Sequence, residues 1–219
     1  MNFALVTAHN EAYKPLADIT WDQNKKLYAE QYGYDALCLT EFTQPVKLIG
    51  FERLQFVVDL LESGKYDWIH VVGSDTMITN FNIKLEDVID NDYDFIIAVD
   101  CLNINNDSFL VRNAPTSITW LKHVVSLRDN YTNSKWYDQS AMIDTIDMMG
   151  DRIKIVPQRE INSYDYWQYP QDYQPHIDKK DILGNDGQWQ PGDFLIQWPG
   201  LTLAQRIPLA KEKLTQIIR

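Results

Sequence analysis

The sequence predicts a single α/β domain. Over the first half of the chain, short apolar runs alternate with segments of helical periodicity in the order strand, helix, strand, helix, strand. One of these runs, Trp68 to Val72, is uninterrupted and ends at a polar turn, as strands of open α/β sheets do. The length of 219 residues suits one domain of this class and is ample for a large core.

The first half of the chain is expected to hold three strands and two helices. The helices are predicted from apolar residues at helical spacing, and each is followed by a glycine that suits a helix C-terminus. A helix, a glycine and a strand in that order form a βαβ unit. The predicted strands cover 3–6, 36–39 and 68–72, and the predicted helices cover 19–32 and 45–63.

From residue 83 onward the chain is expected to add further strands and helices with less regular connections. Residues 83–89 suit a short helix or a loop, and 102–107 form a polar, Asn-rich stretch. Residues 164–192 are rich in Tyr, Gln, Asp and Pro, which predicts long loops rather than a second domain. The predicted strands cover 94–99, 109–111, 153–156 and 194–198, and the predicted helices cover 115–127, 139–148 and 203–218.

The composition disfavours a protein that grips nucleic acid by its phosphates. The formal net charge is −11 and no basic stripe is visible in the sequence. An acidic chain that handles an anionic nucleotide needs local positive charge, from a bound cation or from a few placed Lys and Arg side chains. Aromatic residues make up 12% of the chain, and Tyr and Trp suit stacking on sugars and bases as well as core packing.

The sequence also predicts a soluble protein in a reducing, cytoplasmic environment. Cys38 and Cys101 are too few for a disulfide framework or a zinc site, so we expect buried free thiols. The start of the chain lacks the charged and apolar regions of a signal peptide, and no segment approaches 18 apolar residues.

The turn after the strand 68–72 carries the first candidate functional residue, Asp75. Ligands of open α/β sheets bind beyond the carboxyl ends of the strands, which is where this turn is expected. A carboxylate there suits a divalent cation and the phosphates that the cation carries. The alternative is an ordinary turn in which Asp75 caps the residues that follow.

Five segments carry motifs that are weak one at a time and specific together, because they occur in a fixed order. They are 67–80, with a strand and an Asp-x-Asp-like turn; 104–113, similar to "N-x-G-x-F-L-x-R-N"; 138–141, an acidic-Gln-Ser-Ala helix start; 156–164, similar to "V-P-Q-x-x-x-N-S"; and 192–200, similar to "G-D-F-x-x-H-x-x-G". Over roughly residues 19–200 the chain thus resembles the galactosyl/mannosyl/xylosyltransferase family of the GT-A fold. That family includes yeast Golgi α-galactosyl- and mannosyltransferase subunits and plant xyloglucan xylosyltransferases.

The resemblance implies a single GT-A-like, Rossmann-like domain with a mixed central sheet over 1–219. Residues 1–100 would bind the nucleotide sugar, and 101–219 would form the acceptor side. It also implies a nucleotide-sugar donor, most simply a UDP-sugar, transfer with retention of anomeric configuration, and Mn²⁺ or Mg²⁺ as cofactor. The metal would neutralise the diphosphate leaving group as a Lewis acid.

Three positions depart from the family pattern. Gly73 stands where the first acid of the metal turn is expected, and Gln197 stands where a late metal-binding His is expected. Asp107 replaces the glycine of the "N-x-G" segment, which is expected to alter the acceptor pocket. The predicted metal ligands are therefore Asp75 and Gln197, and an amide oxygen suits manganese less well than His or a carboxylate.

Two residues are predicted to act at the reacting sugar. Asp138 is the candidate acid that stabilises positive charge developing at the anomeric carbon, with a helix N-cap as the alternative role. Gln139 is the candidate hydrogen-bond partner of a sugar hydroxyl.

The remaining candidates are assigned by their position after strands, beside the donor phosphates or in the late loops. For several the alternative is structural: a solvated face for the Lys and Arg, and a loop tucked onto the domain for the aromatic residues. The predicted donor-binding residues are Thr7, Ala8, His9, Asn10, Lys47, Arg53, Ser74, Asp75, Asp100 and Asn105. The predicted acceptor-binding residues are Asn162, Tyr164, Trp167 and Trp189.

Two functions follow from these expectations. The first is a retaining glycosyltransferase that moves a hexose or pentose to a glycan, glycolipid or other hydroxyl acceptor. The second is a nucleotide-sugar-binding module of the same fold with lost or metal-independent turnover, motivated by the altered metal ligands. Without a predicted anchor, a bacterial or viral context is expected. A modified base in DNA is an alternative acceptor that the acidic charge disfavours.

Overall fold

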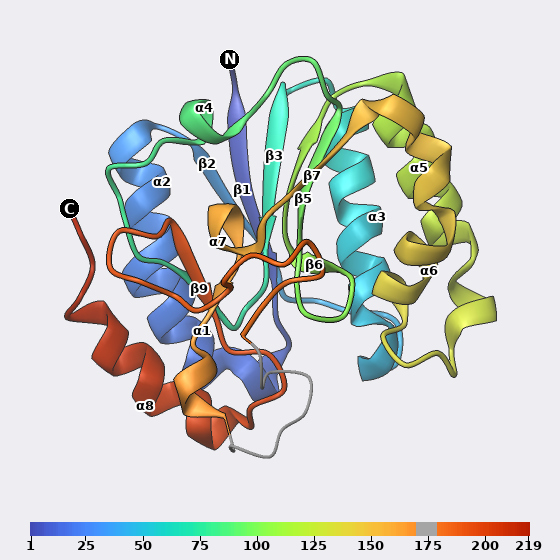
Figure 1. The fold of residues 1–219 in the computed structure, drawn as a ribbon. Helices are drawn as coiled ribbons and strands as arrows, with labels where there is room; N and C mark the ends of the chain where they lie inside the picture. Colours follow the sequence, from blue (N-terminus) through green and yellow to red (C-terminus); the bar gives the residue numbers. More distant parts are fainter. Residues whose placement is uncertain (170–178) are drawn as a thin grey trace.

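The computed structural model describes residues 1–169 and 179–219 and has a mixed α/β fold, as predicted (Figure 1). Its centre is a six-stranded sheet in the order β2-β1-β3-β6-β5-β7. The six strands are β1 (Phe3–Ala8), β2 (Asp35–Leu39), β3 (Trp68–Val72), β5 (Phe95–Val99), β6 (Ile104–Arg112) and β7 (Ile153–Val156). β6 runs antiparallel to β3 and β5, while the other neighbours pair in parallel. The sheet is therefore mixed.

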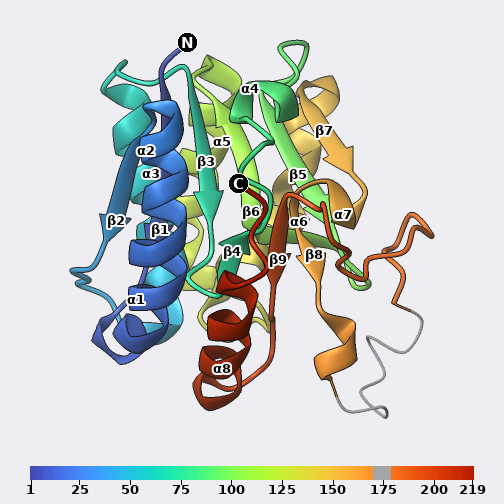
Figure 2. The ribbon, with the colours of Figure 1, turned by 90° about the vertical axis from the view of Figure 1, so that its left-hand side faces the viewer.

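Helices cover both faces of this sheet, and a separate apolar cluster lies on each face (Figures 1 and 2). On one face, α3 (Ile49–Glu62), α5 (Pro115–Ser126) and α6 (Asp138–Thr145) pack onto alternate residues such as Ile69 and Val71 of β3. Because successive strand residues point to opposite faces, the neighbours Trp68 and Val72 join the other cluster.

The second face is covered by N-terminal helices and by a small three-stranded sheet in the order β4-β9-β8 (Figure 2). The last helix packs against the first, and a third apolar cluster that includes Met77, Trp198 and Ala210 joins them. The C-terminal segment thereby returns to the start of the chain. The elements on this side are α1 (Lys14–Thr20), α2 (Lys26–Tyr32), β4 (Thr76–Ile78), α4 (Leu85–Val88), α7 (Gln158–Ile161), β8 (Ser163–Tyr164), β9 (Leu195–Gln197) and α8 (Leu203–Leu214).

The helix predicted over 19–32 is divided in the structure. α1 and α2 are separated by a π-helical segment, Trp21–Lys25, whose side chains at 24 and 25 turn inward. Asn24 makes two hydrogen bonds of 2.8 Å with the backbone of Ile78, and the fully buried Lys25 donates to the Gly73 carbonyl over 2.6 Å. π-bulges often mark functional segments. Through these hydrogen bonds, the π-helical segment holds the turn between β3 and β4 in place.

Several other predicted boundaries were wrong. β1 continues to Ala8, so Thr7 and Ala8 lie in the strand rather than in the loop. β6 covers Ile104–Arg112 and absorbs most of the stretch predicted to be polar and irregular, because buried Asn and Ser side chains are paired there. β4 was not predicted, and α8 ends at Leu214 rather than near 218. The predicted loop region 164–192 overlaps β8 at Tyr164, while 170–178 lies outside the described residues.

β6 carries an irregularity that matters for the site. Its pairing with β5 shifts register between the pairs Ile97–Phe109 and Val99–Ile104, so the intervening β6 residues bow out of the ladder. Bulges of this kind re-aim side chains and are frequent beside active sites. Here the bow contains Asn106 and Asp107.

Among the described residues, none of the helices has the length and apolarity needed to cross a membrane. Cys38 and Cys101 are free, as predicted, although both are half-buried rather than buried.

The buried histidine His70 predicts a specific pH dependence of stability. Its ring is fully buried, lies 3.1 Å from the Ser108 hydroxyl, and has its pKa lowered by burial from 6.5 to about 3. Below pH 6.5 the folded state therefore binds fewer protons than the unfolded state. The contribution of neutral His70 to the free energy of unfolding is complete above pH 6.5 and is lost as the pH falls toward 3.

We expect His70→Gln to remove this contribution. Between pH 7 and pH 5 the wild-type protein should lose about 2 kcal/mol more of its unfolding free energy than the variant does. Urea denaturation of both proteins at the two pH values measures the difference. Equal losses would contradict the assignment of a neutral, buried His70.

Candidate functional site

A cavity of about 440 Å³ opens where β1 and β3 end and β6 begins. This is the edge at which open α/β sheets bind ligands. The N-terminal turn of α3 and the segment before α6 close two further sides. Eight residues predicted to bind the donor or to act on it line the cavity: Ala8, His9, Asn10, Arg53, Ser74, Asp75, Asp138 and Gln139.

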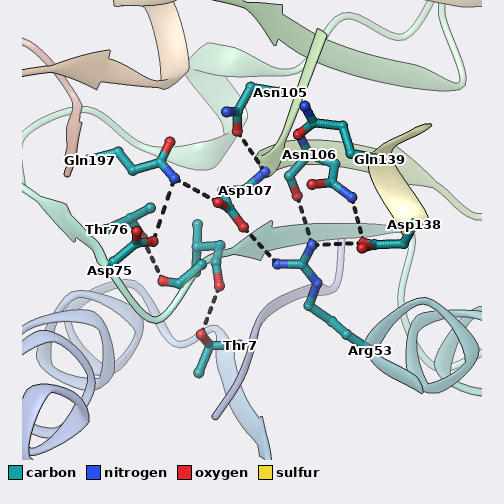
Figure 3. Close-up of polar contacts among 12 residues, drawn as sticks. Thr7, Arg53, Asp75, Thr76, Asn105, Asn106, Asp107, Asp138, Gln139 and Gln197 are labelled. Atoms are coloured by element: carbon teal, nitrogen blue, oxygen red, sulfur yellow. Dashed lines mark hydrogen bonds and ion pairs between the residues drawn. The ribbon is translucent and has the colours of Figure 1, made fainter. Parts of the chain in front are cut away.

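A chain of charged and amide side chains runs along one side of this cavity, which all of its members line except the fully buried Gln197. Figure 3 shows this chain from Asp138 to Asp75. We call it the polar relay, and its members in order are Asp138, Arg53, Asp107, Gln197, Asp75 and Arg206. They come from α6, α3, β6, β9, the β3–β4 turn and α8 respectively. Residues from both halves of the chain therefore form one site.

Arg53 occupies the first half of the relay and is itself buried. Its guanidinium donates to Asp107 Oδ1 over 3.2 Å and to the Asn106 carbonyl over 3.0 Å, and it lies 3.6 Å from Asp138 Oδ2 (Figure 3). One planar cation thus neutralises two acids from different elements, which suits the fork geometry of arginine.

Arg206 closes the other end of the relay from the C-terminal helix. Its Nη2 lies 2.9 Å from Asp75 Oδ2, and it also donates to the Trp198 carbonyl over 2.9 Å and to the Tyr13 hydroxyl over 3.2 Å. Asp75 and Arg206 are each 7% exposed. Burial raises the pKa of Asp75, while Arg206 opposes that rise. Behind the same turn, burial lowers the pKa of Lys25 to about 7.

Gln197 joins the two acids in the middle of the relay. Its Nε2 donates to Asp107 Oδ2 over 2.6 Å and lies 3.5 Å from Asp75 Oδ1 (Figure 3). The Gln197 side chain is fully buried, and its Oε1 has no hydrogen-bond partner among the described residues. The predicted metal ligands Asp75 and Gln197 are therefore brought together.

The donor atoms at this point fit a hard divalent cation. No group of three or more His, Cys, Asp or Glu side chains suited to a metal occurs in the described parts of the chain. However, the carboxylates of Asp75 and Asp107 both face the Gln197 amide, whose carbonyl oxygen has no partner within 1–169 and 179–219. Carboxylate and amide oxygens are ligands that Mg²⁺ and Mn²⁺ accept.

Asp138 faces the cavity from the start of α6, with a side chain that is 13% exposed. Its Oδ2 accepts a 2.6 Å hydrogen bond from Asn106 Nδ2. Burial raises the pKa of Asp138, and Arg53 and Asn106 act in the opposite direction. The alternative role of helix N-cap was wrong, because Tyr137 occupies that position and Asp138 is already helical.

The backbone around Asp138 is specialised at two points. Tyr137, directly before it, has φ 45° and ψ −109°, a conformation that costs energy for a residue with a side chain and is found mainly at functional sites. Gly50, in the first turn of α3, lies against the carboxylate so closely that a Cβ there would overlap Asp138 Oδ1. The absence of a side chain at 50 is what admits the acid.

Other predicted donor residues lie outside the cavity lining. Thr7 is buried and donates to the Val72 carbonyl over 2.7 Å, and the exposed Lys47 donates to the Thr132 carbonyl. Asp100 accepts bonds from the backbone of Leu102 and Asn103 and from the side chain of Asn105, so it organises the loop before β6. The sequence predicted Thr7 and Asp100 near strand ends and Lys47 beside the helix before β3, but the side-chain directions depend on tertiary contacts.

The predicted acceptor residues do not form one surface. Tyr164 is fully buried and donates to Asp100, and Asn162 is also fully buried. Trp189 donates to the Thr79 hydroxyl over 3.1 Å and packs under Lys213. Trp167 is 69% exposed and, like the other three, lies outside the cavity lining.

Several cavity residues were missed. Asn106 and Asp107 lie in a matched motif, but their direction depends on the bow in β6. Arg206 carried no signal, because a single Arg in an amphipathic helix looks like a solvated residue. Three aromatic residues of the cavity lining were also missed: Tyr13, Trp136 and Tyr137. The other missed positions are Val46, Ile49 and Lys135.

Comparison with known proteins supports the fold. No family model matches the sequence, and no curated protein sequence is detectably similar to it. Among solved structures, the chain is similar to a glycosyltransferase involved in the glycosylation of the major capsid of PBCV-1. The TM-score is 0.75 at 14% identity, over 97% of this chain and 100% of that one.

Two further structures show the same architecture. The glycosyltransferase GlyE of Streptococcus pneumoniae TIGR4 matches with a TM-score of 0.62 and 17% identity, over 97% of this chain and 61% of GlyE. The galactosyltransferase LgtC, solved with donor and acceptor sugar analogues, matches with a TM-score of 0.51 and 12% identity, over 99% and 96%. At these identities the likeness shows the fold. The predicted GT-A-like fold is thus confirmed, whereas the yeast and plant family is not singled out.

The contact between Gly50 and Asp138 predicts an unusual response to alanine. In a helix, Gly→Ala normally stabilises a protein by about 0.5–1 kcal/mol. Here we expect Gly50→Ala to destabilise the protein, because the added Cβ displaces the Asp138 carboxylate from Arg53 and Asn106.

A double-mutant cycle isolates the effect. In an Asp138→Ala background the overlap is gone, so Gly50→Ala should become neutral or stabilising. The coupling energy should be on the order of 1–3 kcal/mol by thermal or chemical unfolding. Additive effects of the two substitutions would show that Gly50 does not position Asp138.

Proposed function

We propose that this chain is a glycosyltransferase that transfers a sugar from a nucleotide sugar, most simply a UDP-sugar, to a hydroxyl acceptor with retention of anomeric configuration. One observation carries the proposal: a largely buried carboxylate, Asp138, faces a cavity whose opposite wall is the Asp75 turn. The fold shared with three glycosyltransferases is consistent with it.

The donor diphosphate is proposed to lie over the polar relay. Arg53 and Arg206 supply positive charge on the cavity wall of an otherwise acidic protein, which offsets repulsion of an anionic ligand. His9, Asn10 and Tyr13 follow β1 and offer polar and aromatic contacts for the nucleoside. When bound, a divalent cation at Asp75 and Gln197 would neutralise the leaving diphosphate as a Lewis acid.

The proposed chemistry breaks the bond between the anomeric carbon and the diphosphate and forms a bond from the same carbon to the acceptor oxygen. The acceptor hydroxyl gives up its proton to the departing diphosphate. Asp138 stabilises the positive charge that develops on the sugar, because its buried carboxylate is already oriented by Asn106 and Arg53. Gln139 accepts from the Asn106 backbone through Oε1, which leaves its amide nitrogen for a sugar hydroxyl.

The acceptor is proposed to be a glycan or another hydroxyl compound that enters past Lys135, Trp136 and Tyr137. Aromatic rims suit the apolar faces of sugar rings. A DNA acceptor is disfavoured by the net charge of −11.

The function is tested by release of nucleotide from a panel of nucleotide sugars, with and without Mn²⁺, and by mass spectrometry of products formed with sugar acceptors. If no nucleotide sugar is turned over but nucleotide stabilises the protein against thermal unfolding, the binding-module alternative is favoured. Absence of turnover and of nucleotide binding would end the proposal.

Asp138→Asn is expected to lower the rate of sugar transfer by a factor of about 10² or more, because the variant keeps the hydrogen-bonding shape but loses the charge. Donor affinity, measured by calorimetry, should change much less. Asp147→Asn, an exposed acid outside the cavity lining, is the matched control and should keep wild-type rates. Equal rates for Asp138→Asn and wild type would remove Asp138 from the mechanism.

A further inference from the structure

Asp107 and Gly73 are direct neighbours on adjacent antiparallel strands. The β3–β6 register pairs Val72 with Ser108, and the Gly73 amide donates to the Asp107 carbonyl over 2.7 Å one step further along. Residues directly opposite each other in an antiparallel pair place their side chains on the same face, about 4.5–5.5 Å apart at Cβ. An Asp side chain at 73 and an Asp side chain at 107 can therefore place a carboxylate at the same position.

The space beside Gly73 is occupied by the Asp107 side chain. A Cβ added at Gly73 would lie 3.1 Å from Asp107 Cγ and Oδ1 and 2.9 Å from Asp75 Oδ1. Gly73 has no positive φ, so backbone conformation gives no reason for glycine there. The reason visible in the structure is steric, because a side chain at 73 would crowd the carboxylates of both Asp75 and Asp107.

The Asp107 carboxylate also points to the right partners. Arg53 binds Asp107 Oδ1, so Asp107 Oδ2 faces Gln197. In the same way, Arg206 binds Asp75 Oδ2, so Asp75 Oδ1 faces Gln197. Each acid thus has one oxygen fixed by an arginine and one facing the Gln197 amide. Rotation of that amide by 180° exchanges its nitrogen for the oxygen, which now has no partner in the described part of the chain.

We infer that Asp107 is the second carboxylate of a divalent-cation site formed with Asp75 and Gln197, in place of the side chain that Gly73 lacks. The inference rests on the proposed function, since the cation serves the donor diphosphate. The ligand class is a hard cation, Mg²⁺ or Mn²⁺, bound by two carboxylate oxygens and one amide oxygen. Because Arg53 and Arg206 reduce the negative charge of the site, we expect binding to tighten when a nucleotide diphosphate is present.

The experiment measures binding of Mn²⁺ to the full chain by electron paramagnetic resonance of the free ion, with and without UDP, and needs no turnover. Asp107→Asn is expected to weaken Mn²⁺ binding at least tenfold. Asp147→Asn removes the same charge from an exposed site and should bind within twofold of wild type, which controls for general attraction to an acidic protein. Circular dichroism confirms that each variant is folded.

A positional swap separates a ligand from a mere structural acid. Gly73→Asp alone should weaken Mn²⁺ binding, because the new side chain meets Asp107 and Asp75. Asp107→Gly alone should also weaken it. In the double variant Asp107→Gly with Gly73→Asp, only the contact with Asp75 Oδ1 remains, and a small rotation of that side chain relieves it. The double variant should therefore restore binding to within about threefold of wild type. Restoration supports the inference in a way that stability effects cannot.

Three results would overturn the inference: wild-type protein that binds no Mn²⁺ even with UDP, Asp107→Asn that binds as tightly as wild type, or a folded double variant no better than Asp107→Gly. Sugar transfer is measured separately. Transfer without Asp107-dependent Mn²⁺ binding overturns only this inference, and Mn²⁺ binding without transfer overturns only the proposed function.

Discussion

The fold depends at its centre on keeping buried charges paired. An isolated ionised side chain in a protein interior costs several kcal/mol, and breaking a buried pair costs about 3–5 kcal/mol. The polar relay meets this constraint by alternating acids with arginines and an amide from α6 to α8. Because its members come from six different elements, the relay holds the large sheet, the small sheet and the terminal helix in one arrangement. Packing of apolar residues forms the layers, but the relay determines how they meet at the cavity.

The relay also explains how an acidic protein can present a site for an anion. Arg53 and Arg206 are attached to separate helices and converge only in the folded chain, so the positive charge is local and does not appear as a basic stripe in the sequence. Lys25 adds a buried amine behind the turn, held by the π-helical segment. Arg53 and Arg206 are paired with the three acids of the relay, which keeps the unliganded site close to electrical balance.

Much of the fold could be predicted, because apolar periodicity reports burial directly: β3, β7 and the long helix α3 were found near their true bounds. The elements that were missed depend on contacts distant in sequence. β4 is three residues long and exists through pairing with β9, and β6 gains its first half from buried amides and hydroxyls. For the site, residues immediately after β1 and β3 were predicted, since strand ends define the binding edge. Arg206 and the aromatic rim were not, because α8 and the segment before α6 reach the cavity only through tertiary packing.

The contact between positions 73 and 107 has an evolutionary consequence. In the sequence, a missing acid at 73 and an extra acid at 107 looked like two unrelated departures from a family pattern. A side chain at 73 would crowd the Asp107 carboxylate, so the two positions form an epistatic pair in which the residue tolerated at one depends on the other. A lineage moving the acid between strands must pass through a state with glycine at both positions or with crowding at both. Related chains should therefore carry a large side chain at one of these positions and a small one at the other. A search for two acids on a single turn would overlook the members in which the pair is divided between two strands.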